Sequence, residues 1–176
     1  MLLDRLFRPR PAKAVGRALY ARVVEQSRGR VLYADLGAPD TVEGRFEIYS
    51  LHVVLLLDRL RGHGELAREV SQSLFDTYVT SLDNALREMG VGDLSVGRKM
   101  RKLGEALYGR GKSYDAAFAS LPDTGPLQAL LTRTVYAETD GSAASGMVAY
   151  VLAVRATLAT QPLDQLLAGD VDWTAA

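Results

Sequence analysis

The sequence predicts an all-α protein, a single-domain bundle of about six or seven helices with two long antiparallel helices at its centre. Apolar residues recur at helical spacing through nearly the whole chain. Only residues 30–36 (RVLYADL) have the composition of a strand, and one isolated strand has no partner to pair with. The length of 176 residues, with 48% apolar and 24% charged residues, fits one domain that buries its own core.

The first elements are expected to be one helix over residues 13–27 and a longer one that begins near Asp40. The Asp40 carboxylate can cap this second helix, and Glu43, three residues later, completes a capping-box pattern. Gly62 and Gly64 supply the backbone freedom that ends it. Six apolar residues lie on one of its faces, at alternating steps of four and three: Val42, Phe46, Tyr49, Val53, Leu56 and Leu60.

The second long central helix is expected to end at Gly90. Only a few residues separate it from the preceding helix, so the two should be antiparallel neighbours. Its stripe consists of seven apolar residues: Leu66, Val70, Leu74, Tyr78, Leu82, Leu86 and Met89. The next helix is expected to end at Gly109, and its apolar face consists of Val96, Met100, Leu103 and Leu107.

The last third of the chain is expected to contain shorter helices and one more long one. The pattern allows a short helix over residues 114–121, and Pro126, at a first-turn position, opens a helix that reaches Tyr136. A short turn is expected after Pro162. The last long helix is marked by Met147, Val151, Val154 and Leu158.

The composition excludes several classes of site. Cysteine is absent, so no disulfide, thiolate nucleophile or Cys-ligated metal can form within this chain. No run reaches the roughly 18–20 apolar residues that cross a bilayer. The N-terminal residues carry charge within their apolar part, which excludes a secretory signal. We therefore expect a protein that stays in the cytosol.

The formal net charge is zero, but the charges are unevenly distributed. Opposed blocks of this kind create local fields that can orient partners. The net charges of four successive blocks are +6 for residues 1–30, −5 for 31–90, +4 for 91–112 and −5 for 113–176. Residues 1–12 form a basic amphipathic segment, typical either of a short membrane-surface helix or of ordinary packing. Residues 13–176 form the helical domain.

Two glycine-rich motifs do not meet the requirements of nucleotide binding. The GRGKS run at residues 109–113 lacks the first glycine of a phosphate loop, because residue 106 is Ala106. Gly90 and Gly92 are followed by Gly97 rather than by a glycine three residues on, so the dinucleotide fingerprint is absent too.

His52 is the one histidine in an apolar helical run, and we expect it to be a core residue with its hydrogen bonds satisfied. As a catalytic base it would need an orienting acid and a nucleophile. Glu43, Glu47 and Asp58 are available on the same helix, but none forms a recognisable triad. The residues therefore show no evident active site, although a hydrolase that uses His52 with a carboxylate stays open, and we expect no cofactor.

A basic run follows the second long helix, and it makes one side of the next helix positive. Its members are Arg98, Lys99, Arg101 and Lys102, joined further on by Arg110 and Lys112. Such a face is either simply solvated or binds an anionic partner: an acidic protein segment, RNA or a membrane surface. Proteins that bind single-stranded RNA usually carry aromatic residues between their basic ones. Only Tyr108 and Tyr114 lie near this run, which favours a protein partner over RNA.

Two segments resemble the ubiquinol–cytochrome c chaperone family, found in mitochondria and in alphaproteobacteria. One is APDT at residues 38–41, continued by GRF at 44–46 and LH at 51–52. The other is LREMGVGDLSVGRKM at residues 86–100, continued by LYGR at 107–110. The resemblance extends over roughly residues 13–160. Because the chain starts close to the family core without a presequence, it resembles a bacterial member.

The resemblance implies an all-α assembly factor for complex III, not an enzyme, whose client is cytochrome b or another complex III subunit. It also implies a small partner protein and, in mitochondria, a place near the ribosome. We expect a cytoplasmic protein with peripheral contact at the anionic cytoplasmic face of the inner membrane. The alternative is an RNA-binding, ribosome-binding or general protein-interaction module that uses the basic helix at residues 96–112.

The working surface is expected at the glycine-rich connection, residues 90–97, and on the basic helix that follows. A chaperone of a membrane protein needs exposed apolar surface together with charge that matches the client or the leaflet. The candidate partner-binding residues are Gly90, Val91, Asp93, Arg98, Lys99, Arg101 and Lys102. A simpler interpretation is that Gly90 and Gly92 form a turn and that Asp93 or Ser95 caps a helix.

Overall fold

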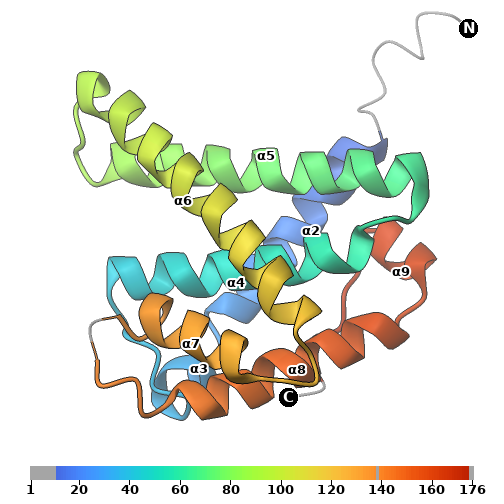
Figure 1. The fold of residues 1–176 in the computed structure, drawn as a ribbon. Helices are drawn as coiled ribbons and strands as arrows, with labels where there is room; N and C mark the ends of the chain where they lie inside the picture. The colour runs from blue at the N-terminus through green and yellow to red at the C-terminus, as the bar shows by residue number, and fades with distance from the viewer. Residues whose placement is uncertain (1–10, 138, 175–176) are drawn as a thin grey trace, which may run out of the picture.

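The computed structural model describes residues 11–137 and 139–174, except for the side chains of Pro11, Asp93 and Leu94. This part of the chain contains helices and turns and no strand, so the predicted all-α fold is confirmed (Figure 1). Of the predicted segment 1–12, residues 1–10 lie outside the described residues. The helices, two of them only five residues long, are α2 (Pro11–Ser27), α3 (Arg30–Ala34), α4 (Val42–Leu60), α5 (Gly64–Glu88), α6 (Asp93–Ala119), α7 (Gly125–Thr134), α8 (Ala144–Thr160) and α9 (Leu163–Leu167).

The two long central helices are α4 and α5, which run antiparallel as the short connection predicts (Figure 1). Helix α2 packs most extensively against α5. The two backbones approach so closely that a Cβ atom on Gly16 would lie 2.4 Å from Ser73 Oγ and 2.7 Å from the Leu74 nitrogen. Glycine at position 16 therefore sets the spacing between these helices.

The start of α4 corrects the predicted capping box by one residue. Thr41 has extended backbone angles, and its hydroxyl oxygen accepts a hydrogen bond from the Gly44 amide at 3.0 Å. Asp40, the expected cap, accepts a hydrogen bond from Arg45 Nε at 2.5 Å instead. Threonine and aspartate both cap helices, so the local sequence alone does not distinguish the two starts.

Helix α6 corrects the prediction that one helix ends at Gly109 and a short one follows over residues 114–121. It continues through Gly109 and Gly111 to Ala119. Each interior glycine costs a helix roughly 1 kcal/mol relative to alanine. The continuation buries Tyr114 and Phe118, at 0% and 7% exposure, and this burial outweighs the cost of the glycines.

The strand-like segment at residues 30–36 contains the short helix α3, whose Leu32 is buried. The predicted helix at Pro126 is α7, which ends at Thr134 rather than at Tyr136. The last long helix is α8, and the expected turn after Pro162 is α9. Within the described residues no helix combines the length and the apolar character that crossing a bilayer requires.

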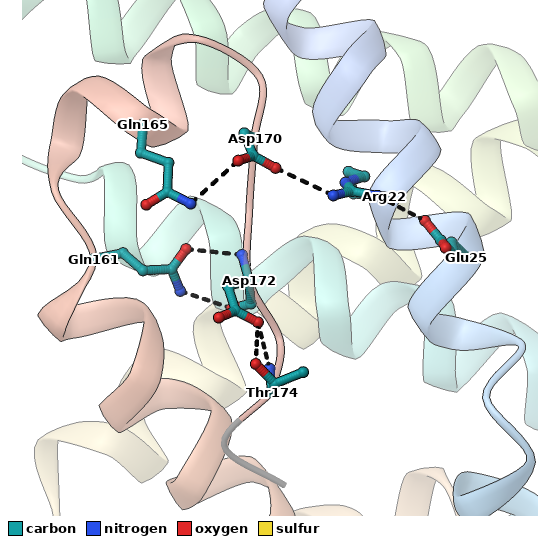
Figure 2. Close-up of polar contacts among 7 residues, drawn as sticks. All are labelled: Arg22, Glu25, Gln161, Gln165, Asp170, Asp172 and Thr174. Carbon is teal, nitrogen blue, oxygen red and sulfur yellow. Dashed lines mark hydrogen bonds and ion pairs between the residues drawn. The ribbon is translucent and has the colours of Figure 1, made fainter.

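A C-terminal tail, residues 168–174, packs back onto the bundle. Asp170 accepts a hydrogen bond from Arg22 on α2 at 3.2 Å (Figure 2). The Gln161 side chain amide binds both backbone polar groups of Asp172, accepting from the nitrogen at 2.9 Å and donating to the oxygen at 2.7 Å. Val171 and Trp173 are thereby buried in the core, an arrangement that the helical patterns did not predict.

Candidate functional site

One part of the fold stands apart from the core. Between Leu82 and Leu107, no described apolar side chain belongs to the main hydrophobic cluster or packs against it. Residues 83–106, called the arm below, comprise the end of α5, the turn and the first half of α6. In Figure 1 the arm is the yellow-green end of the molecule, where the start of α6 rises away from α5. Leu86 and Val96 are buried within the arm itself.

The turn of the arm forms because Gly90 reverses the chain after α5. Gly90 has a φ of +79°, which favours glycine. Its amide donates to the Arg87 oxygen at 2.9 Å, and the Val91 amide donates to the Leu86 oxygen at 3.1 Å. This pair of bonds is a Schellman motif, so Gly90 and half-buried Val91 close α5.

The second half of the predicted glycine-rich connection is helical. Helix α6 begins at Asp93, so the turn is shorter than expected and Gly97 lies inside the helix. The side chain of Asp93 lies outside the described part of the chain. A Cβ on Gly97 or Gly104 would meet nothing within 4 Å, which shows that both glycines face open space.

The four predicted basic residues of the arm gather on one face of α6. Arg98, Lys99, Arg101 and Lys102 are all exposed. At 3.6 residues per turn, Arg98, Arg101 and Lys102 point away from buried Val96, and Lys99 lies at the edge of the Val96 side. None of the four forms an ion pair with a residue that the structure describes. The arm therefore presents four cationic groups that the fold does not neutralise.

Arg110 does not belong to this free basic face, which corrects the expectation from the sequence. Its Nε and Nη2 atoms donate to the two carboxylate oxygens of Glu47 on α4, at 2.8 and 2.6 Å. The Glu47 side chain is only 9% exposed. Lys112 is also engaged, because its Nζ lies 4.6 Å from the centre of the Tyr108 ring.

Aromatic residues offer little stacking surface near the basic face. Tyr108 is 67% exposed, but Tyr114 is completely buried and cannot stack on a base. The exposed apolar side chain nearest the turn is Met89, at 54%. A flexible methionine at the tip suits contact with varied apolar surfaces.

His52 is a core histidine, as the sequence predicts, and it is completely buried. Its Nδ1 lies 2.8 Å from the Ile48 carbonyl oxygen, which can only accept, so Nδ1 carries the proton. Nε2 then accepts from the Tyr150 hydroxyl at 2.6 Å. Burial lowers the pKa of His52 to about 4, which keeps the ring neutral. The edge of the ring meets Trp173 of the C-terminal tail, with ring centres 5.3 Å apart.

The described residues contain no cluster suited to holding a metal. No three His, Asp or Glu side chains in residues 11–137 and 139–174 are grouped as metal ligands would be. Outside the arm, charged side chains form ion pairs within the fold, such as Asp58 with Arg155 at 2.8 Å. The arm, with its free charge, is therefore the candidate interaction surface.

Comparison with known proteins identifies the family. The family model described as ubiquinol-cytochrome C chaperone matches residues 34–173. A solved structure, the crystal structure of the Cbp3 homolog from Brucella abortus, is 34% identical, with a TM-score of 0.84. The similarity covers 97% of this chain and 95% of that one. No curated protein matches the chain. With the family match spanning most of the helical bundle, the chain belongs to the ubiquinol-cytochrome C chaperone family.

Proposed function

We propose that this protein is a non-enzymatic chaperone that binds cytochrome b, or another complex III subunit, during assembly of ubiquinol–cytochrome c reductase. The observation that carries the proposal is the family match over residues 34–173. The fold is consistent with it, because the one histidine in the core is neutral and fully hydrogen-bonded, as a structural residue is. The proposed activity is therefore holding a client rather than transforming a substrate.

We place the client contact on the arm, at the turn formed by Gly90 and Val91, at Asp93 and on the basic face. No described apolar side chain of the arm belongs to the main core, so binding there does not compete with folding of the bundle. Met89 supplies exposed apolar surface at the tip. The unpaired cations supply attraction to acidic client loops. These cations are Arg98, Lys99, Arg101 and Lys102.

The same face would also hold the protein against an anionic membrane surface, where an unassembled membrane protein is found. Each Lys or Arg near an anionic leaflet contributes roughly 1 kcal/mol of attraction. Four cations on one helical face therefore support peripheral membrane contact. The RNA-binding alternative uses the same cations but has less support, because Tyr114 is buried and leaves Tyr108 alone as an exposed aromatic.

Capture from membranes tests the proposal. An N-terminally tagged chain, expressed in a strain that lacks the native gene, is purified from detergent-solubilised membranes, and copurified cytochrome b is detected by its haem spectrum. We expect cytochrome b or another complex III subunit in the eluate, together with any small partner protein. The strain without the gene should contain less assembled complex III while its other respiratory complexes remain.

A charge-reversal variant locates the surface. Replacing the four arm cations by glutamate should abolish capture and leave the melting temperature nearly unchanged, because none of them is paired in the fold. A matched control reverses Arg17 and Arg133, which are exposed elsewhere on the bundle and lack an ion pair to any described residue. Normal complex III in the deletion strain, with no complex III subunit captured, would overturn the proposed function. Capture that survives the reversal would overturn only the placement on the arm.

A binding assay with single-stranded RNA tests the alternative that the basic face binds nucleic acid. If wild-type protein retains RNA at low salt and loses it steeply as salt rises, the basic face binds nucleic acid. We expect no retention that depends on the four arm cations.

A further inference from the structure

A second cationic site lies in a pocket between the end of α2, α3 and the start of α4. The pocket has a volume of about 460 Å³. Its polar lining consists of Arg28, Arg30, Tyr33, Asp40, Arg45 and Tyr49. Three guanidinium groups and one carboxylate leave the lining with two net positive charges.

The hydrogen bonds within the pocket leave most of its donors available. Arg28 uses Nε to donate to the Tyr49 hydroxyl at 3.1 Å. Arg45 uses Nε to donate to Asp40 at 2.5 Å. Each of these two arginines therefore keeps its two terminal nitrogens for another acceptor. Arg30 has no hydrogen-bond or ion-pair partner among the described residues.

The tyrosines give the pocket a fixed wall. Tyr33 is half-buried and donates to the Ser27 backbone oxygen at 2.7 Å. Burial raises the pKa of Tyr33, so its hydroxyl stays protonated. The Tyr49 hydroxyl accepts from Arg28, which leaves its own proton free to be donated to a ligand. The guanidinium of Arg45 holds the pKa of Asp40 below its usual range, so the carboxylate stays charged.

We propose that this pocket binds a phosphate group, held by Arg28, Arg30 and Arg45 with the Tyr49 hydroxyl as a further donor. Planar guanidinium groups match phosphate oxygens in bidentate geometry. A phosphate monoester carries about −1.5 to −2 charges at neutral pH, which matches the two net positive charges of the lining. A single carboxylate would leave one of them uncompensated. The pocket volume leaves room for the organic group that carries the phosphate.

Isothermal titration calorimetry with inorganic phosphate, at constant ionic strength, tests the pocket. Wild-type protein should bind one phosphate. Arg30→Gln should weaken binding about tenfold, because it removes one charge-assisted contact and disturbs no contact within the fold. Asp40→Asn should strengthen binding roughly threefold, because it removes the one negative charge of the lining. Arg133→Gln, an exposed arginine outside the pocket, is the control.

The Asp40 variant makes the test specific, since damage to the fold would weaken phosphate binding and not strengthen it. No phosphate binding to the wild-type protein, or equal binding by wild type and Arg30→Gln, would overturn the proposal.

Vesicles identify the source of the phosphate. If the protein cosediments with phosphatidic acid vesicles and Arg30→Gln reduces this cosedimentation, the phosphate belongs to a lipid headgroup. If calorimetry shows phosphate binding but the protein does not cosediment in this way, the ligand is a soluble phosphate compound. Phosphatidylcholine vesicles are the control. Cosedimentation that depends only on the four arm cations would assign membrane contact to the arm, and the calorimetry would then still decide the pocket. This inference does not depend on the identity of the client.

Discussion

Arg110 on α6 and Glu47 on α4 form a bidentate ion pair, with nitrogen–oxygen distances of 2.8 and 2.6 Å. The two residues are 63 positions apart and belong to oppositely charged blocks of the sequence. The pair joins the second half of α6 to a central helix of the body. The first half of α6, which carries the free cations, lies beyond this attachment and packs in the arm.

Removing the arginine of this pair should destabilise the fold. Arg110→Ala leaves the carboxylate of Glu47, only 9% exposed, without its partner. We expect a loss of about 2–3 kcal/mol in the free energy of unfolding, measured with urea. The control is Arg68→Ala, whose partner Glu65 is 68% exposed, and here we expect a much smaller loss. Equal effects of the two variants would contradict a structural role for the Glu47 pair.

The stability of the protein should depend on pH through His52. The pKa of His52 is about 4 in the fold and about 6.5 in the unfolded chain. Above pH 6.5 the ring is neutral in both states, so its titration does not change the free energy of unfolding. As the pH falls from 6.5 to 4, the unfolded chain binds a proton that the fold does not, so stability falls by about 3 kcal/mol.

A variant isolates this contribution from that of the carboxylates, which also titrate in acid. His52→Gln carries no titratable group, so its unfolding free energy should fall less steeply between pH 6.5 and pH 4. Urea unfolding at several pH values measures the difference in slope. Parallel curves for the two proteins would show that the pKa of His52 is the same in the folded and the unfolded chain.

The C-terminal tail should contribute to stability mainly through the apolar surface of Trp173. Trp173 is 8% exposed, and its indole N–H has no hydrogen-bond partner among the described residues. We expect Trp173→Ala to lose about 3 kcal/mol, because it leaves a cavity beside His52. Trp173→Phe keeps most of the packing and loses no hydrogen bond, so its cost should stay below about 1.5 kcal/mol. Unfolding followed by circular dichroism compares the variants, and a similar loss in both would assign the effect to the indole nitrogen.

Two glycine-to-alanine substitutions in the arm should have opposite effects. Gly104 is helical and faces open space, so Gly104→Ala should stabilise the arm by up to about 1 kcal/mol. Gly90 also faces open space but has a φ of +79°, so Gly90→Ala should destabilise the turn by about 1 kcal/mol. Hydrogen exchange of the arm amides measures both changes. Stabilisation by Gly90→Ala would mean that the turn does not depend on the left-handed backbone at Gly90.

Much of the fold follows from the apolar periodicity of the sequence. The apolar stripes predicted the long helices α4 and α5, and the short connection between them predicted that they run antiparallel. The boundaries were less well predicted where local signals compete. Asp40 and Thr41 both suit a helix cap; in the structure Thr41 caps α4, and the Asp40 carboxylate binds Arg45 instead.

Glycine misled the prediction for α6, since local propensity favours a stop at Gly109. Helix α6 continues past Gly109 because this buries Tyr114 and brings Arg110 into contact with Glu47. Both contacts depend on α4, which is far away in sequence. The same contact removes Arg110 from the predicted basic face. For the tail, Val171 and Trp173 were the available signal, two apolar residues among acidic ones. The placement of the working surface on the arm remains a prediction.

The separation of the arm from the main core also affects how such a protein can evolve. Most substitutions are eliminated because they destabilise a packed interior, and surface positions without such contacts tolerate change. Residues 83–106 add no described apolar side chain to the main core. Mutation can therefore adjust this segment to a changing binding partner while the bundle stays folded, so selection for recognition and selection for folding act on different parts of one chain.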